Sequence, residues 1–184
     1  ERSKYIFRSE DNVRFIDRRT SLKARVPVLF KDNKEGLFAL RVSSQLEHPS
    51  PKVARVYSEN GIVKMLDTTI TSGRYESREG VLGEDVFGRR SPWLKLSGKI
   101  NNKPVAMAII DHPKNVNYPG FWMARGYGLF SINPLGAEAY TEGQEKLNFS
   151  LEKDQSVTFK HRLILAPQLS RSDIERYKDF FSRE

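Results

Sequence analysis

The residues best suited to acid–base chemistry form an Asp-His-Pro motif, Asp111-His112-Pro113, which directly follows the apolar run at residues 105–110. Histidine titrates near neutral pH and can accept or donate a proton. Proline ends a β-ladder and fixes the backbone, so we expect His112 at the rim of a sheet, beside Asp111. The motif predicts either an acid–base residue or a histidine that holds the following loop by hydrogen bonds.

A second group combines aromatic rings with an arginine in the sequence FWMARGYG, residues 121–128. Aromatic rings stack on the apolar faces of sugars, and arginine donates in-plane hydrogen bonds to hydroxyls or carboxylates. Trp122, Arg125 and Tyr127 are therefore candidate sugar-binding residues. Tryptophan is also common in protein cores, so a purely structural role for Trp122 stays open.

A third group is the charged turn DNKEG, residues 32–36, which precedes an apolar strand. An exposed carboxylate beside a lysine contributes little to stability. The density of charge before a buried strand also suits a pocket, which makes Lys34 and Glu35 candidates. Oxygen atoms of Asp32, Glu35 or Asp111 could hold calcium, but nothing in the spacing demands a metal or another cofactor.

The amino-acid composition and the absence of known motifs exclude several classes of functional site. The 184 residues include 31 Lys and Arg against 23 Asp and Glu, with no cysteine. The absence of cysteine excludes disulfides, thiolate metal sites and a cysteine nucleophile. The basic residues are dispersed along the sequence, which disfavours nucleic-acid binding. No apolar run approaches the ~20 residues of a membrane span, and phosphate-loop, dinucleotide, HExxH and GxSxG motifs are missing.

β-Strands must position these candidates, because apolar and polar residues alternate with a period of two along most of the chain. Short turns between alternating runs predict hairpins. We expect three of them: residues 55–58 with 62–66 around Asn60-Gly61, residues 93–100 with 105–110 around Asn101-Asn102, and residues 146–152 with 156–166.

One helix is expected, at the C-terminal end. Ser170 can cap it, and Asp173 three residues later completes a capping box. An aromatic and aliphatic stripe at helical spacing should pack on a sheet; its members are Ile174, Tyr177, Phe180 and Phe181. The alternative is a partner-binding helix, which would leave Phe180 and Phe181 exposed.

These elements predict an all-β fold, an antiparallel β-sandwich that could be part of a larger supersandwich, with one C-terminal α-helix. We expect the sandwich domain to span residues 1–168 and the helix, residues 169–184, to pack on the same domain. Two stretches are atypical of sandwich strands. They are residues 74–90, with several glycines and mixed charges, and residues 111–127, where polar and aromatic groups concentrate.

The chain resembles the PmoA-like family of bacterial proteins, whose members often carry the label "methane oxygenase PmoA". The resemblance covers about residues 20–166 and rests on KDNKEGLFALRV (31–42), FGRRSPWLKLSG (87–98) and AIIDHPKNVNYPGFWMARGYGLFSINPLG (108–136). Family members are longer at the N-terminus, so the chain resembles their C-terminal portion, and an absent N-terminal region could complete the site. The chain has no membrane span and lacks copper-ligand spacing, so a true methane mono-oxygenase is not implied.

The resemblance implies an exported protein, periplasmic or secreted, from bacteria that degrade glycans, with a fold similar to galactose-mutarotase-like sandwiches. Met123 stands where family members often have histidine. The recurrent polar set of the family falls on Lys34, Glu35, Arg41, Arg90, Trp93, Asp111, His112, Asn115, Trp122, Arg125, Tyr127 and Asn133.

The leading hypothesis is a carbohydrate-active protein with a sugar or glycan in a concave sheet site. His112 and Glu35 would be its catalytic acid–base pair, in a hydrolase, lyase or epimerase. The residues expected to bind the substrate are Lys34, Arg41, Asp111, Asn115, Trp122, Arg125, Tyr127 and Asn133. The alternatives are a non-catalytic carbohydrate-binding module and a protein-interaction domain. The discriminating feature is whether His112 and Glu35 meet across one pocket.

Overall fold

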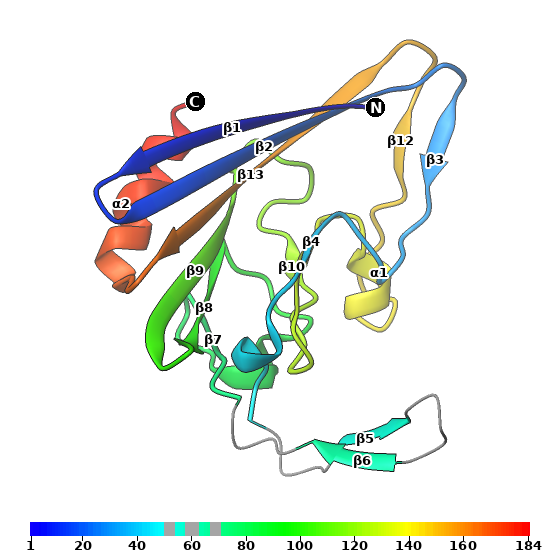
Figure 1. Cartoon of the computed structure of the whole chain (residues 1–184). Coiled ribbons are helices and arrows are strands. Elements are labelled where there is room, and N and C mark those ends of the chain that lie inside the picture. Colours follow the sequence, from blue (N-terminus) through cyan, green and yellow to red (C-terminus); the bar gives the residue numbers. More distant parts are fainter. Residues whose placement is uncertain (50–53, 58–62, 67–70) are drawn as a thin grey trace.

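A six-stranded antiparallel sheet, in the order β1-β2-β13-β9-β8-β7, dominates the computed structural model (Figure 1). The model describes residues 1–49, 54–57, 63–66 and 71–184. The strands of this sheet are β1 (Arg2–Glu10), β2 (Val13–Lys23), β7 (Arg74–Ser77), β8 (Trp93–Ile100), β9 (Lys103–Asp111) and β13 (Ser156–Ala166).

Smaller elements complete the fold. A three-stranded sheet has the order β10-β11-β4, and two further pairs are β12 with β3 and β5 with β6. Their bounds are β3 (Val28–Phe30), β4 (Phe38–Arg41), β5 (Ala54–Tyr57), β6 (Val63–Leu66), β10 (Phe121–Trp122), β11 (Leu129–Asn133) and β12 (Phe149–Leu151). The helical elements are the 3-10 helices η1 (Ser44–Leu46) and η3 (Gly83–Val86), and the α-helices α1 (Ala137–Tyr140) and α2 (Arg171–Ser182). The predicted all-β fold class with one long C-terminal helix is confirmed.

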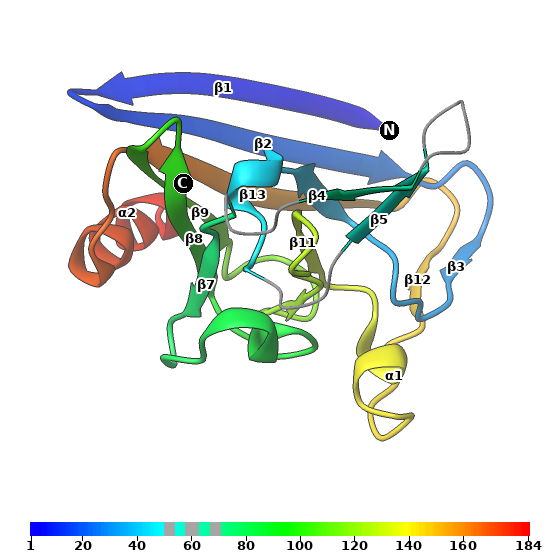
Figure 2. The same ribbon diagram turned by 60° about the horizontal axis from the view of Figure 1, so that its bottom comes forward.

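Side chains along β8 and β9 point alternately to the two faces of the large sheet, so the sheet packs against one layer on each face. Leu94 and Ile109 are fully buried in a cluster with Trp122 and other residues of the small sheet. Their neighbours point the opposite way: Trp93 is fully buried in a second cluster with α2. Figure 2 shows α2 and the small sheet on opposite sides of β7, β8 and β9. Each large apolar side chain buried this way contributes about 1.5–3 kcal/mol.

Two of the predicted hairpins are present. Trp93 pairs with Ile110 across β8 and β9, and Asn101 and Asn102 have φ values of 51° and 62°, the left-handed pair that a two-residue type I′ turn requires. β5 and β6 also pair in antiparallel register. The turn predicted at Asn60-Gly61 lies outside the described residues.

The third predicted hairpin is wrong. β12 pairs with β3, while β13 pairs with β2 and β9. The Phe30 and Phe149 rings pack with their centroids 5.9 Å apart, which holds β12 to a strand far away in sequence. The pattern also gave no sign of β1, because its residues are almost all exposed on both faces and show no buried side.

The capping box at the start of α2 is confirmed, since Ser170 and Asp173 bond reciprocally. Ile174, Tyr177 and Phe181 are buried as predicted, but the side chain of Phe180 is 58% exposed. The expected stripe therefore loses Phe180, because its direction on the helix points away from the sheet.

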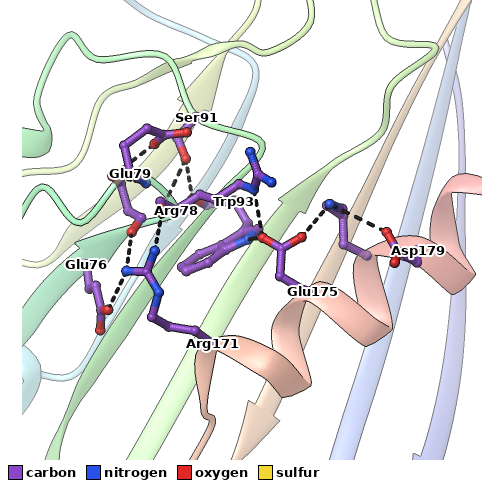
Figure 3. Close-up of polar contacts among 10 residues, drawn as sticks. Glu76, Arg78, Glu79, Ser91, Trp93, Arg171, Glu175 and Asp179 are labelled. Carbon is purple, nitrogen blue, oxygen red and sulfur yellow. Dashed lines mark hydrogen bonds and ion pairs between the residues drawn. The ribbon is translucent and has the colours of Figure 1, made fainter.

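Polar contacts also fix α2 to the sheet edge (Figure 3). The carboxylate of Glu175 accepts hydrogen bonds from Trp93 Nε1 and Arg78 Nε, each at 2.8 Å. Arg171 reaches back to Glu76 on β7 at 3.0 Å. These bonds satisfy the buried indole N–H and set the height of the helix over β8.

Candidate functional site

The structure separates the predicted site residues into a buried group and an exposed group. Six of the predicted residues are buried: Asp111, His112, Asn115, Trp122, Asn133 and the family residue Trp93. Lys34, Glu35, Arg41 and Tyr127 are exposed, whereas Arg125 and the family residue Arg90 are half-buried. The buried residues are therefore considered first for a structural role, and the exposed and half-buried residues for contact with a ligand.

Asp111 organises a buried hydrogen-bond network at the end of β9. Its carboxylate accepts hydrogen bonds from Asn115 Nδ2 at 2.6 Å and from the Gly120 backbone N–H at 2.9 Å. Asn115 also exchanges hydrogen bonds with the backbone of Lys160 on β13, at 2.7 and 2.8 Å. This network pins the loop after β9 to β13, so Asp111 and Asn115 hold the fold and do not face a ligand.

Burial raises the pKa of Asp111 to about 6, although its hydrogen bonds from Gly120 and Asn115 oppose the rise. His161 Nε2 lies 3.6 Å from the Asp111 carboxylate, and burial lowers the pKa of this histidine to about 3. At neutral pH the histidine is thus uncharged, and the Asp111 charge is stabilised by hydrogen bonds alone.

His112 lies in the core rather than at an open rim. Its Nδ1 accepts a hydrogen bond from the Lys114 backbone N–H at 3.1 Å, and its ring meets Phe181 edge-on with centroids 5.1 Å apart. Burial, followed by the charges of Lys160 and Lys114, lowers the pKa of His112 to about 4. The loop-holding alternative therefore describes His112 better than an acid–base role.

Trp122 and Asn133 are also structural. Trp122 is completely buried, and its Nε1 donates to the Ser91 carbonyl at 3.0 Å. It cannot serve as an exposed platform for a sugar. Asn133 Nδ2 donates to the Asn33 carbonyl at 2.7 Å, so this side chain fixes the predicted charged turn from below.

The structure does not bring His112 and Glu35 together. The Glu35 and Lys34 side chains are 64% and 69% exposed and lie 4.0 Å from each other on a surface turn, whereas His112 is fully buried. The predicted acid–base pair is thus not supported, because a buried ring and a solvent-exposed carboxylate share no pocket among the described residues.

The side chain of Asp32, the other acidic residue of this turn, is fully engaged in hydrogen bonds from backbone N–H groups. Its carboxylate accepts N–H groups of Glu138, Leu147 and Asn148, each at 2.9 Å. These bonds and Lys146 lower its pKa against the raising effect of burial. Across the part of the chain that the structure describes, no group of three or more potential metal-ligating side chains comes together.

An open cleft of about 880 Å³ contains Arg125 of the predicted binding set and the family residue Arg90. We call it the Arg125 cleft. It lies between the segment from η3 to Arg90 and the end of α1. Its lining is Glu79, Val81, Glu84, Asp85, Phe87, Gly88, Arg89, Arg90, Arg125, Ala139, Tyr140 and Glu142.

Local backbone contacts build this cleft. Gly88 N–H donates to the Trp122 carbonyl and Trp122 N–H to the Arg89 carbonyl, at 2.8 and 2.9 Å. They fasten the segment after η3 to β10, so the buried Trp122 positions the cleft through its backbone. Gly88 has a φ of 70°, which favours glycine at this bend.

The guanidinium of Arg125 lies over the Phe87 ring, 3.4 Å from its centroid. Tyr140 meets the same ring edge-on, with centroids 5.7 Å apart, and stacks on Phe121 at 5.1 Å. Burial raises the pKa of Tyr140 to about 12, so its hydroxyl stays protonated and donates to the Lys34 carbonyl at 2.6 Å.

The arginines of the cleft differ in their partners. Arg90 is saturated, since it donates to the carbonyls of Asn117 and Pro119 and contacts Glu145. The guanidinium groups of Arg125 and Arg89 meet no hydrogen-bond acceptor among the described residues. Arg125 is therefore rigidly stacked, yet its N–H donors are free for a ligand.

Arg41 and Tyr127 form a separate exposed pair. The Arg41 guanidinium lies 5.2 Å from the Tyr127 ring centroid and donates to the Tyr127 carbonyl at 2.9 Å. Neither residue lines the Arg125 cleft. The structure thus divides the predicted binding set, and only Arg125 belongs to the cleft.

Sequence reasoning missed Phe87, Arg89, Glu84 and Tyr140 as members of one site. The charged, glycine-rich stretch at residues 74–90 was a usable signal, because three of the four residues come from it. Tyr140 could not be added, since the contact between α1 and Phe87 is visible only in three dimensions.

Comparisons with known proteins identify a family and no relative. A family model described as "Family of unknown function (DUF6807)" matches residues 1–179. No curated protein and no solved structure matches the chain. These comparisons give neither the PmoA label nor a galactose-mutarotase-like fold. Among the described residues, no helix has the length and apolar character needed to cross a membrane.

Proposed function

Since the chain belongs to the DUF6807 family, whose function is unknown, we propose its function from its own geometry: it binds a carbohydrate in the Arg125 cleft. The observation that carries the proposal is the Arg125 guanidinium, which is stacked on Phe87 at 3.4 Å with its donors unpaired. Such a group is preorganised to donate in-plane hydrogen bonds to ligand oxygens.

The remaining lining suits a hydroxyl-rich ligand. Glu84 and Asp85 offer carboxylate acceptors, Arg89 adds a second free donor, and Phe87 and Tyr140 provide apolar ring surface. Sugar hydroxyls both donate and accept, so a cleft with interleaved donors and acceptors matches them better than it matches a uniformly charged ligand. A volume of about 880 Å³ falls within the usual range of small-ligand sites.

The proposal is for binding rather than for a particular reaction. Hydrolysis, elimination or epimerisation through His112 and Glu35 loses its support, because these residues lie apart. The resemblance to PmoA-like and mutarotase-like proteins supports a carbohydrate ligand. An exported location in a glycan-degrading bacterium belongs to the same proposal.

Titration calorimetry with a panel of neutral and acidic mono- and oligosaccharides tests the proposal. A sugar that binds the parent should bind Arg125→Gln at least tenfold more weakly, because its donors are lost. Arg41→Gln is the matched control, since Arg41 also lies over an aromatic ring but outside the cleft. The proposal fails if no sugar binds, or if Arg41→Gln weakens binding as much as Arg125→Gln does.

A further inference from the structure

Three cationic residues lie side by side on neighbouring strands of the large sheet, with Lys4 exposed and Arg19 and Lys160 half-buried. Arg19 on β2 pairs in register with Lys4 on β1 and with Lys160 on β13. Residues paired in register lie side by side on the same face, with Cβ atoms about 4.5–5.5 Å apart. We call Lys4, Arg19 and Lys160 the basic row. Like charges directly opposite one another destabilise a sheet, so this row calls for a compensating anion.

The chain supplies little counter-charge to this row. Arg19 bonds to the Glu184 carboxylate at 2.9 Å, and Arg8 and Arg162 share that carboxylate at 2.8 and 3.0 Å. Arg8 and Arg162 also pair with Asp17, at 3.2 and 2.6 Å, so Asp17 compensates them and not the row. Lys160 reaches only the Glu184 carbonyl. Lys4 forms no ion pair within the described part of the chain.

Two hydrogen-bond donors near the row are buried and unpartnered. Arg19 Nε and His112 Nε2 are shielded from solvent and form no hydrogen bond of good geometry among the described residues, although the Phe181 backbone lies close enough to His112 to act on its pKa in the raising direction. His112 Nδ1 is an acceptor for Lys114 N–H, so its proton sits on Nε2. Buried polar groups are almost always satisfied, and an arriving oxygen atom would satisfy the Arg19 donor.

The positive charges in this region also lower the pKa values of His112 and Lys160. The charges of Lys160, Lys114 and Arg19 all lower the pKa of His112, after the larger effect of burial. Burial, Arg19 and Lys114 likewise lower the pKa of Lys160 against the opposing charge of Glu184. Lys160, Lys114 and Arg19 thus act on one region beside the C-terminal end of α2, and Lys114 forms its exposed margin.

We propose that the basic row binds a compact oxyanion, a phosphate or sulfate group, with Arg19 as its central donor and Lys4 and Lys160 on either side. Oxyanions match this set because charge-assisted N–H···O bonds are stronger than neutral ones, and arginine can bind such a group through two N–H donors. The site is distinct from the Arg125 cleft, since the two share no residue.

Thermal denaturation in sodium phosphate and in sodium sulfate, against sodium chloride at matched ionic strength, tests the proposal. Both oxyanions should raise the melting temperature of the parent above its value in chloride. Lys160→Met should bind either oxyanion at least tenfold more weakly, while being no less stable than the parent in chloride because a like-charge contact is gone. Lys103→Met, near the opposite end of β9, is the charge-matched control and should behave as the parent.

A second measurement keeps the test independent of folding. In NMR titrations, the pKa of His112 should rise when phosphate is present, because a bound anion offsets the charges of Lys160, Lys114 and Arg19. The proposal is overturned if phosphate and sulfate stabilise no more than chloride, or if Lys103→Met loses as much binding as Lys160→Met. It is also overturned if only long polyanions such as oligonucleotides bind.

Discussion

At the scale of single residues, the Asp-His-Pro motif shows that a buried structural network can have the same sequence pattern as a catalytic site. Asp111 receives hydrogen bonds from Asn115 and Gly120, and its role is to hold the loop after β9. Catalytic and structural networks use the same residue types, so the sequence alone could not separate them. Burial, which distinguishes them here, depends on β13 and α2, and both are distant in sequence.

The Asp111→Asn variant should unfold about 2–4 kcal/mol more easily than the parent, because it places an N–H₂ group against a buried donor and removes a charged acceptor. The exposed Asp154→Asn, in a turn where Asp154 has a φ of 68°, serves as control and should shift stability by less than about 0.5 kcal/mol. Urea denaturation measures both. Equal, small effects would show that the Asp111 network contributes nothing.

The two buried histidines make stability depend on pH. The pKa values of His112 and His161 are lowered to about 4 and about 3 from an ordinary 6.5. Below pH 6.5 both histidines are therefore protonated in the unfolded chain but stay neutral in the folded chain until the pH approaches their lowered pKa values. The stability that these residues provide is complete above pH 6.5 and is lost as the pH falls toward 4.

Asp111 acts with the opposite sign, because its pKa is raised to about 6, so the folded state takes up this proton before the unfolded state does. The two histidines outweigh the one carboxyl, and the net loss of stability between pH 7 and pH 4.5 should be about 3 kcal/mol. His112→Asn, which keeps an acceptor for Lys114 N–H, should show a shallower loss in urea denaturation across this range. An unchanged slope would mean that His112 does not titrate against the fold.

At the scale of elements, local signals were predictable and long-range pairing was not. Two consecutive asparagines identify the β8–β9 turn, and Ser170 with Asp173 identifies the start of α2. β12 was assigned to the wrong partner, because its pairing with β3 joins segments more than a hundred residues apart. No periodicity within a short window carries that information.

The last turn of α2 provides a matched test of helix packing. Phe181 is fully buried against the sheet, while the adjacent Phe180 is 58% exposed. Phe181→Ala should lower the free energy of unfolding by about 3–5 kcal/mol, whereas Phe180→Ala should change it by less than about 1 kcal/mol. Circular dichroism during chemical denaturation measures both. A large loss for Phe180→Ala would indicate that this ring is covered, as an intermolecular contact would cover it.

At the scale of the whole molecule, the large sheet supports two apolar cores, one on each face. Trp93 belongs to the core between the sheet and α2, and Trp122 to the core between the sheet and the small sheet. They are the two tryptophans of the chain, and both are fully buried. Each indole therefore reports on one face of the same sheet.

Because β8 and β9 contribute alternate side chains to both cores, neither core can be lost while the other remains packed. We expect Trp93→Phe and Trp122→Phe, each with one remaining tryptophan, to unfold in a single transition when followed by fluorescence. In each variant that transition should coincide with the loss of circular dichroism, as two-state unfolding requires. If Trp93 fluorescence changed before Trp122 fluorescence, α2 would detach as a separate unit. The C-terminal helix would then be an appendage of the sandwich rather than part of its core.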